Sequence, residues 1–184
     1  EQFIHPMAMQ GITSTQHAFF QYLIGNTDFS VSFQHNGKLL YTNKEFLPLP
    51  YDFDMTGWVD PSYGFGNPTL GLSSLTERVY RGFKRDAEVM NTVRQQFLDS
   101  KESIVSLVNS FKNEFDDQSE FNKMFKFMNG FFEIIEDDKK FNKFYVAEDY
   151  HQDYKKKNPF NPYIMKVSTP RINKFKMKYP ELIK

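Results

Sequence analysis

Apolar residues recur at helical spacing in three long segments of this chain. Residues 11–25 carry an apolar stripe along one face, and Gly25 is the kind of residue that ends a helix. Residues 86–115 repeat apolar positions every three or four residues, which predicts one helix or two helices that break near Asp99–Ser100. Residues 118–138 show the same spacing, so we expect another helix there.

Short apolar runs rich in β-prone residues follow the first of these helices. Residues 29–33 and 38–42 are two such runs, and the Asn36–Gly37 pair between them is a strong signal for a two-residue hairpin turn. A third strand is expected over residues 46–54, whose prolines suit the edge of a sheet. The Gly- and Pro-rich residues 56–72 predict a long loop, and such loops are usually functional or mobile.

The remaining segments complete the predicted fold. Ser74 and Glu77 have the spacing of a capping box, so we expect a helix over residues 73–83. From Phe141 onward the chain is weakly periodic and rich in Lys, Tyr and Pro, which favours an extended tail. Together the elements predict a mostly helical α+β fold with a small antiparallel β-hairpin. We divide the chain into a domain of residues 1–148 (with parts 12–57, 58–72 and 73–140) and a basic extended tail of residues 149–184.

Composition narrows the class of protein. A chain of 184 residues that is 40% hydrophobic and holds 21 Phe can bury a substantial core and is not a disordered protein. The formal net charge is zero, which gives no indication of nucleic acid as a partner. The absence of Cys excludes disulfides and Cys-based zinc sites, and no apolar run predicts a transmembrane segment. The compartment stays open between the cytoplasm and a bacterial extracytoplasmic space.

Acidic and amide residues are set among the apolar segments of the first third. Asp52 and Asp54 are two positions apart on a predicted strand, so their side chains should share one face. Their mutual repulsion would be relieved by a hard divalent cation such as Mg²⁺, which prefers oxygen ligands. The alternative is a strand end whose acids are solvated or cap a turn. Asp28 and the His35–Asn36 pair each lie in what could equally be ordinary turns.

The order of these parts resembles the C-terminal lobe of atypical kinases of the CotH-type and HipA-like group. The resemblance rests on Gly-Asn-Thr-Asp at residues 25–28, His-Asn at 35–36 and Asp-Phe-Asp at 52–54. It implies a kinase C-lobe-like fold and Mg²⁺ (or Mn²⁺) with ATP as cofactors. It also implies roles for six residues: Asp28 as the catalytic aspartate, Asn36, Asp52 and Asp54 as metal ligands, and Asn26 and His35 as supporting or phosphate-side groups.

This resemblance carries expectations about activity and partners. Eight positions separate Asp28 from Asn36, more than in the family pattern, and no residues matching an N-terminal lobe precede the first helix. We therefore expect the C-lobe of a phosphotransferase, a fragment of a longer protein that is inactive alone. The implied partners are the missing N-terminal lobe and a protein or small hydroxyl acceptor, with homo-association through uncovered apolar surface. Two alternatives stay open, a catalytically dead kinase-like binding or scaffold module and a DxD metal-dependent glycosyltransferase.

Overall fold

The computed structural model describes residues 4–146 and, beyond them, residues 165, 170, 173, 174 and 177. Contacts within the chain divide it into two units, Glu1–Val146 and Ala147–Lys184. The division predicted at residue 148 stays a prediction. The first unit contains the following elements: η1 (Pro6–Ala8), α1 (Gly11–Ile24), β1 (Gly37–Thr42), β2 (Glu45–Pro50), η2 (Pro68–Leu70), α2 (Ala87–Asp99), α3 (Lys101–Ser110), η3 (Lys112–Glu114), α4 (Gln118–Glu136) and α5 (Asp138–Val146).

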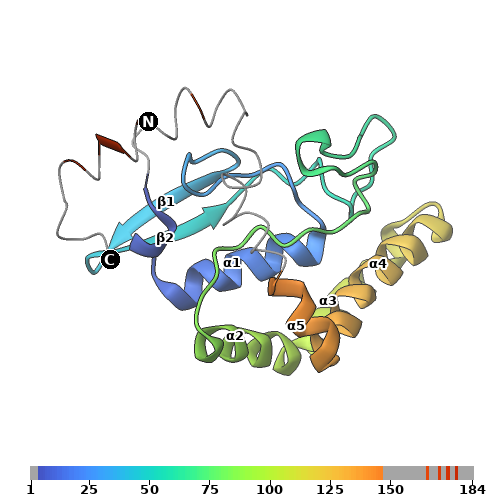
Figure 1. Ribbon diagram of the computed structural model, residues 1–184. Coiled ribbons are helices and arrows are strands. Elements are labelled where there is room, and N and C mark those ends of the chain that lie inside the picture. Colours follow the sequence, from blue (N-terminus) through green and yellow to red (C-terminus); the bar gives the residue numbers. More distant parts are fainter. Residues whose placement is uncertain (1–3, 147–164, 166–169, 171–172, 175–176, 178–184) are drawn as a thin grey trace. The chain divides into compact units, whose positions relative to one another are not determined.

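Helix α1 is the central element of this unit. The β1–β2 hairpin lies along one side of it, and α2 and α4 pack on it from the other side (Figure 1). The Gln10 side chain caps its first turn by accepting a hydrogen bond from the Thr13 N–H at 2.6 Å. Gly25 ends it in the left-handed conformation with φ 65°, as the sequence predicts. The mostly helical α+β fold with one small antiparallel sheet is therefore confirmed.

The hairpin forms one turn later in the sequence than predicted. Strand β1 pairs with β2 in a register that sets Thr42 opposite Glu45. Both turn residues, Asn43 and Lys44, have positive φ, of 50° and 64°. Two positive φ values are typical of the type I′ turn, whose twist matches that of the strands it joins. The hairpin turn predicted at Asn36–Gly37 is wrong. The strand predicted over residues 29–33 is also wrong, because that segment forms turns.

Some of the predicted helices are confirmed and others are wrong. The break at Asp99–Ser100 separates α2 from α3, and the helix over residues 118–138 is confirmed as α4. Residues 73–83 form no helix, although Glu77 accepts hydrogen bonds from the N–H groups of Ser73 and Ser74 as in a capping box. The tail predicted to be extended from Phe141 is helical at its start, where α5 buries Phe141. Most of the remaining tail lies outside the described residues.

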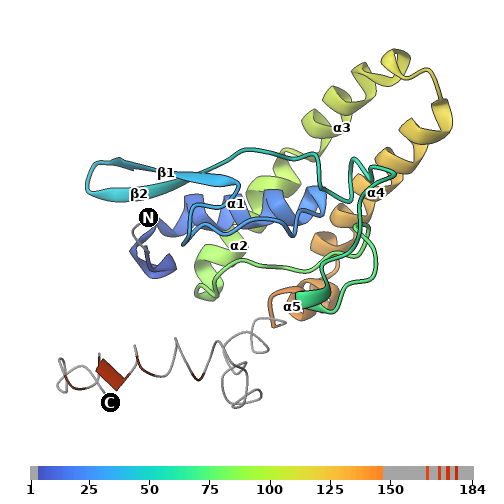
Figure 2. The ribbon, with the colours of Figure 1, turned by 90° about the horizontal axis from the view of Figure 1, so that it is seen from above.

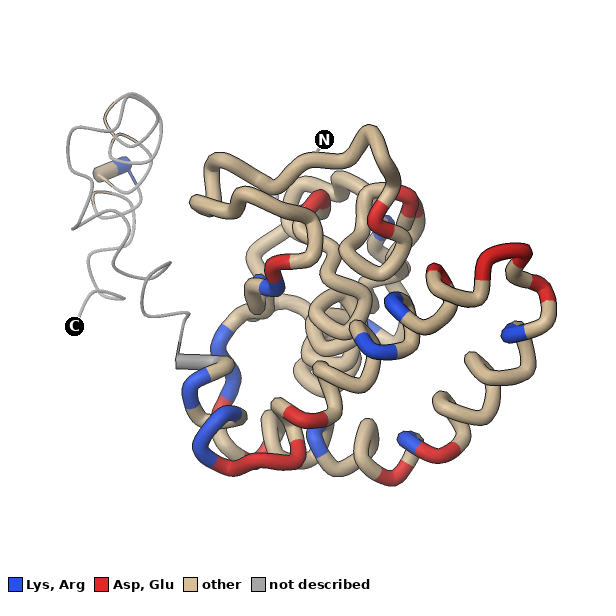
Figure 3. The backbone as a smooth tube through the Cα atoms, turned by 90° about the vertical axis from the view of Figure 1, so that its right-hand side faces the viewer, with Lys and Arg blue, Asp and Glu red and all other residues tan. Residues whose placement is uncertain are grey.

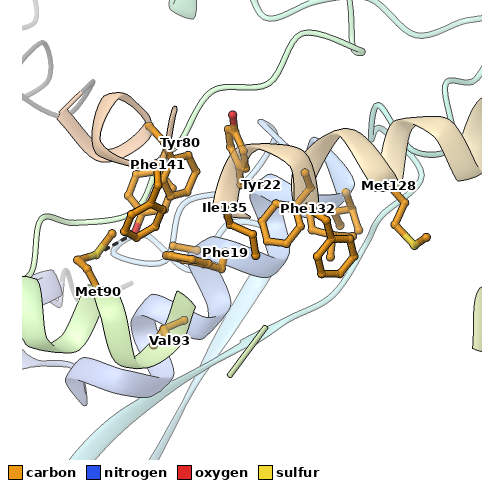
Figure 4. Packing of buried hydrophobic residues seen from close by; sticks show 14 of the residues in the cluster. Phe19, Tyr22, Tyr80, Met90, Val93, Met128, Phe132, Ile135 and Phe141 are labelled. Atoms are coloured by element: carbon orange, nitrogen blue, oxygen red, sulfur yellow. Dashed lines mark hydrogen bonds between the residues drawn. The ribbon is translucent and has the colours of Figure 1, made fainter. Parts of the chain in front are cut away.

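The core is built mainly from aromatic rings. Phe19 of α1 is fully buried and meets Tyr80, Phe131 and Phe144 edge-to-face, with ring centroids 6.1, 6.4 and 5.3 Å apart. Figure 4 shows this cluster between α1, α2 and α4, with the Tyr80 hydroxyl directed at the Met90 sulfur. Aromatic contacts of this kind hold α4 and α5 against α1.

Helices α3 and α4 diverge from the core and meet at a turn on the periphery (Figure 2). Acidic residues gather at this turn (Figure 3), and Asp117 caps α4 by accepting a hydrogen bond from the Ser119 N–H at 2.7 Å. Hydrogen bonds from Ser119 lower the pKa of Asp117 below its ordinary value. None of the helices among the described residues combines the length and apolarity that a membrane crossing requires.

Candidate functional site

Asp28 lies just after α1 and is the centre of a polar cluster. Its Oδ1 is 3.0 Å from His35 Nε2, and the side chains of both residues are about half exposed, at 54% and 58%. The Asn36 Nδ2 donates to Asp28 Oδ2 at 3.1 Å and to the Asp28 main-chain carbonyl at 2.8 Å. Asn36 can reach back in this way because it adopts the left-handed conformation, with φ 48°, immediately before β1.

The side chains of Asn26 and Arg81 fix the backbone on either side of Asp28. Asn26 is only 2% exposed, and its Oδ1 accepts a hydrogen bond from the Asp28 N–H at 2.8 Å. Arg81 donates to the main-chain carbonyls of Thr27 and Phe29, one on each side of Asp28. Burial lowers the pKa of Arg81, and the nearby Asp28 carboxylate opposes this effect. The backbone at Asp28 is therefore held on both sides.

Asp52 and Asp54 form a carboxyl pair beside this cluster. They lie after β2 rather than on a strand, because Asp52 has φ 64° and the strand ends at Pro50. The hydrogen bond to Asp54 and the charge of that carboxylate raise the pKa of Asp52, and the charge of Asp28 adds to the rise. The six residues singled out from the sequence therefore lie in one region.

This cluster is not arranged as a metal site. Within the part of the chain that the structure describes, no group of three His, Cys, Asp or Glu side chains could hold a metal ion. Asn36 turns its NH₂ group toward Asp28, and an NH₂ group cannot ligate a cation. The expectation that Asn36, Asp52 and Asp54 bind Mg²⁺ therefore lacks support, whereas any other role of the six residues stays a prediction.

A separate pocket of about 490 Å³ lies where α1, β2 and the α2–α3 junction meet. It combines apolar walls with uncharged polar groups, which is the usual character of a site for a small ligand. Among the residues that the structure describes, no Lys, Arg, Asp or Glu lines it. The lining residues are Thr13, Gln16, His17, Phe20, Pro48, Pro50, Gln96, Phe97, Ser100 and Ile104.

His17 is the titratable group of this pocket. It is 6% exposed, and burial lowers its pKa to about 4, so the imidazole is neutral at pH 7. Its Nε2 lies 3.4 Å from Gln21 Nε2, a distance at the outer limit of a hydrogen bond. At the rim, Gln16 Nε2 donates to Gln96 Oε1 at 2.8 Å and so joins α1 to α2.

One ring contact connects the pocket with the carboxyl pair. Phe20 lines the pocket, and its ring meets Phe53 edge-to-face with centroids 5.5 Å apart. Phe53 is the residue between Asp52 and Asp54. The acidic pair is therefore tied to a wall of the pocket through two aromatic side chains.

Comparisons with known proteins point to one family. The family model described as peptide methionine sulfoxide reductase matches residues 83–182, more than half of the chain. Peptide methionine sulfoxide reductase MsrA 2 of Synechocystis is 43% identical over 44 residues, which are 24% of this chain and 21% of that protein. The MsrA proteins of Saccharolobus solfataricus and Pasteurella multocida are 39% identical over 51 residues and 51% identical over 41 residues. These cover 28% and 22% of this chain.

The chain thus spans only 21% to 29% of the length of these relatives. No solved structure matches it significantly. The family match begins at Phe83, so the polar cluster around Asp28 precedes it, whereas the four pocket residues of α2, α3 and their junction lie within it.

The family match overturns the kinase interpretation. The chain is neither a CotH-type or HipA-like kinase lobe nor the dead kinase-like module or DxD glycosyltransferase kept as alternatives. Mg²⁺, Mn²⁺ and ATP lose their support together with that function. The interpretation was wrong because it relied on the order of short motifs at residues 25–54, each of which also suits an ordinary turn. The expected partners, including a second copy of the chain, stay predictions.

The pocket was not predicted from the sequence. Its residues come from three segments that are far apart in the chain, and a single sequence does not show which segments meet. One local signal was present, because Gln16, His17 and Gln21 interrupt residues 16–24 of α1, which are otherwise apolar. Polar side chains on a buried helix face need partners, and so they indicate a site.

Proposed function

We propose, because this chain belongs to the peptide methionine sulfoxide reductase family, that it takes part in reducing methionine sulfoxide in peptides. The observation that carries the proposal is the family match over residues 83–182. That match includes the pocket wall formed by Gln96, Phe97, Ser100 and Ile104. The chain represents a fraction of its relatives' length, so the proposal concerns the protein to which these residues belong.

The pocket suits the side chain of methionine sulfoxide. That side chain is uncharged and combines an apolar methyl group with a strongly polar S–O bond. Phe20, Phe97 and Ile104 offer apolar surface for the methyl group. The carboxamides of Gln16 and Gln96 and the Ser100 hydroxyl offer donors for the sulfoxide oxygen. A pocket without charged groups does not favour a cationic or anionic side chain in the same place.

The electrons must come from a group that this sequence does not contain. Reduction of a sulfoxide consumes two electrons and two protons, breaks the S–O bond and releases water. Two thiols supply both when they are oxidised to a disulfide. Because these 184 residues hold no Cys, we assign the electrons to a thiol outside them.

We assign to Asp52 the delivery of one of these protons, and the thiol that is oxidised returns a proton to its carboxylate. The hydrogen bond to Asp54 raises the pKa of Asp52, and Phe53 joins the two carboxyls to the pocket wall through Phe20. A carboxylic acid that keeps its proton closer to neutral pH is a better general acid. Neither carboxyl lines the pocket, so on this proposal Asp52 donates through an intervening water as the sulfoxide oxygen leaves.

Calorimetric titration tests whether the pocket binds its proposed ligand. Blocked peptides carrying methionine, or either separated epimer of methionine sulfoxide, would be titrated into the chain. We expect binding of one sulfoxide epimer in preference to methionine, since reductases of this kind act on one epimer. Ser100→Ala should weaken that binding about fivefold, the effect of one typical hydrogen bond. Ser103→Ala is the matched control, because it removes an exposed hydroxyl of α3 outside the pocket. Equal affinity for sulfoxide and methionine would refute the proposal.

Turnover tests the chemistry separately. With a sulfoxide peptide and dithiothreitol, chromatography should show the methionine peptide accumulating faster with the chain present than with dithiothreitol alone. Asp52→Asn should slow this reaction without weakening the binding measured by calorimetry. If the chain binds the sulfoxide but never accelerates its reduction, the role in catalysis is wrong and only recognition remains.

A further inference from the structure

Met7 differs from the other methionines between residues 4 and 146. It is 55% exposed, whereas Met9, Met90 and Met128 are buried and Met55 and Met124 are half-buried. Oxidants reach a thioether in proportion to its exposure, and oxidation turns an apolar side chain into a polar and chiral one. Exposure alone therefore places Met7 first among these methionines for oxidation.

The sulfur of Met7 also has a fixed partner. The Arg85 guanidinium donates from Nη1 to Met7 Sδ at 3.3 Å. Its other terminal nitrogen donates to the main-chain carbonyl of Pro6 at 2.7 Å and to Ser14 Oγ at 3.0 Å. Because the guanidinium is anchored on η1 and on α1, it approaches the sulfur from one defined direction.

We propose that Met7 is a site of stereoselective sulfoxidation by hydrogen peroxide, with Arg85 selecting the epimer. A thioether sulfur has two lone pairs, and attack through one or the other gives opposite epimers of the sulfoxide. The hydrogen bond from Arg85 occupies one lone pair and leaves the other open to solvent. This inference concerns the chain as a target of oxidation and does not depend on the proposed reductase function.

The reaction balances with peroxide as the only oxidant. The open lone pair of the sulfur attacks one peroxide oxygen, so that an S–O bond forms and the O–O bond breaks. The second oxygen leaves as hydroxide and takes the proton carried by the oxygen now on sulfur, giving water. Sulfur loses two electrons and the peroxide gains them. Arg85 donates its hydrogen bond throughout and transfers no proton.

Met90 provides an internal control for the role of exposure. Its sulfur also faces a donor, the Tyr80 hydroxyl at 4.0 Å, but Met90 is 1% exposed. If a nearby donor were enough to direct oxidation, Met90 and Met7 would react alike. If exposure is required, Met7 reacts and Met90 does not.

Peptide mapping after mild peroxide treatment of the folded chain tests this inference. Peptides containing the two sulfoxide epimers are diastereomers, so reversed-phase chromatography with mass spectrometry separates and counts them. We expect Met7 to be oxidised before Met9, Met90 and Met128, with one epimer in about fivefold excess, the bias given by one typical hydrogen bond. Arg85→Leu should bring the two epimers close to equal amounts.

A second measurement needs no variant. Oxidation of the wild-type chain in concentrated urea removes the Arg85 contact without changing the sequence, and there the epimers at Met7 should form equally. This control applies even if Arg85→Leu fails to fold. Equal epimers at Met7 in the folded chain, or oxidation of Met90 as fast as that of Met7, would overturn the proposal.

Discussion

Arg78 donates a hydrogen bond from its Nε to the main-chain carbonyl of Tyr22, 56 positions earlier in the chain, at 3.0 Å. Its Nη2 donates to the carbonyls of Leu23 and Phe127, and its guanidinium lies 3.5 Å from the centroid of the Phe127 ring. The residue thus satisfies carbonyls at the end of α1 and joins them to α4. Burial lowers the pKa of Arg78 to about 10, which leaves it charged at neutral pH.

Replacing Arg78 should therefore be costly. Arg78→Met keeps an apolar stem but removes the charged donor from three partly buried carbonyls, of which that of Tyr22 keeps the Gly25 N–H. Each hydrogen bond lost from a charged group costs about 1.5–3 kcal/mol. We expect the free energy of unfolding, measured in urea, to fall by about 3 kcal/mol or more. Lys126→Met, at an exposed position of α4, is the control and should change it by less than about 0.5 kcal/mol. A similar small change for Arg78→Met would contradict this role.

Gly25 should tolerate no larger side chain. Its φ is +65°, and a Cβ would lie 2.7 Å from Phe127 Cζ and 3.3 Å from the Gly57 nitrogen. Gly25→Ala should lower the free energy of unfolding by about 3 kcal/mol, because left-handed strain and overpacking add. Gly71 has φ +73° with open space around it, so Gly71→Ala should cost only about 1–2 kcal/mol. Equal losses in thermal or urea unfolding would show that the contact with Phe127 is unimportant.

Buried His17 should make stability depend on pH. Its pKa falls from 6.5 to about 4 on folding, so between these values the unfolded chain binds a proton that the folded chain does not. Stability therefore decreases as the pH falls from 6.5 to 4, by roughly 3 kcal/mol in total. His17→Gln should remove this component while keeping a polar partner for Gln21. Urea unfolding of both proteins at several pH values measures the difference, and parallel curves would disprove the assignment.

The carboxyl pair should titrate together. Asp54→Asn should lower the pKa of Asp52 toward its ordinary value, because it removes the carboxylate that repels its negative charge. Asp28→Asn should lower it less, since Asp28 makes the smaller contribution. Because the folded pKa is raised, the stabilisation from the shared proton is present at low pH and is lost as the pH rises through that pKa. Carbon-13 spectra of the carboxyl groups report each titration, and an unchanged Asp52 in Asp54→Asn would contradict the pairing.

The sequence correctly predicted those helices whose ends and faces depend only on residues close by in the chain. The positive φ of Gly25 and the break at Ser100 follow from single residues and from periodicity. The long amphipathic pattern of α4 was also sufficient, even with Gly130 inside it. Where a helix depends on its own face and caps, the sequence alone indicates it.

Elements that depend on distant partners could not be predicted in this way. Ser74 and Glu77 meet as a capping box would require, yet the segment after them stays irregular because Arg78, Arg81 and Arg85 bind carbonyls of other elements. Asn36–Gly37 has the composition of a hairpin turn, but Asn36 is drawn to Asp28 and the turn forms at Asn43–Lys44. The polar cluster was located, but the kinase function inferred from it was wrong, since residue types without geometry do not separate ligands from hydrogen-bond donors.

Ser100 is the single residue between α2 and α3, and its φ and ψ of −87° and −5° stay close to helical values. Ser100 also lines the pocket, so a ligand there would touch the residue from which α3 starts. Helix α3 projects from the core beyond this point, and we call it the arm (Figure 2). The ten residues of α3 make this arm ~15 Å long, so a 10° rotation at Ser100 would displace its far end by ~3 Å. A spectroscopic label on Ser110 would therefore report whether occupancy of the pocket rotates α3 about Ser100.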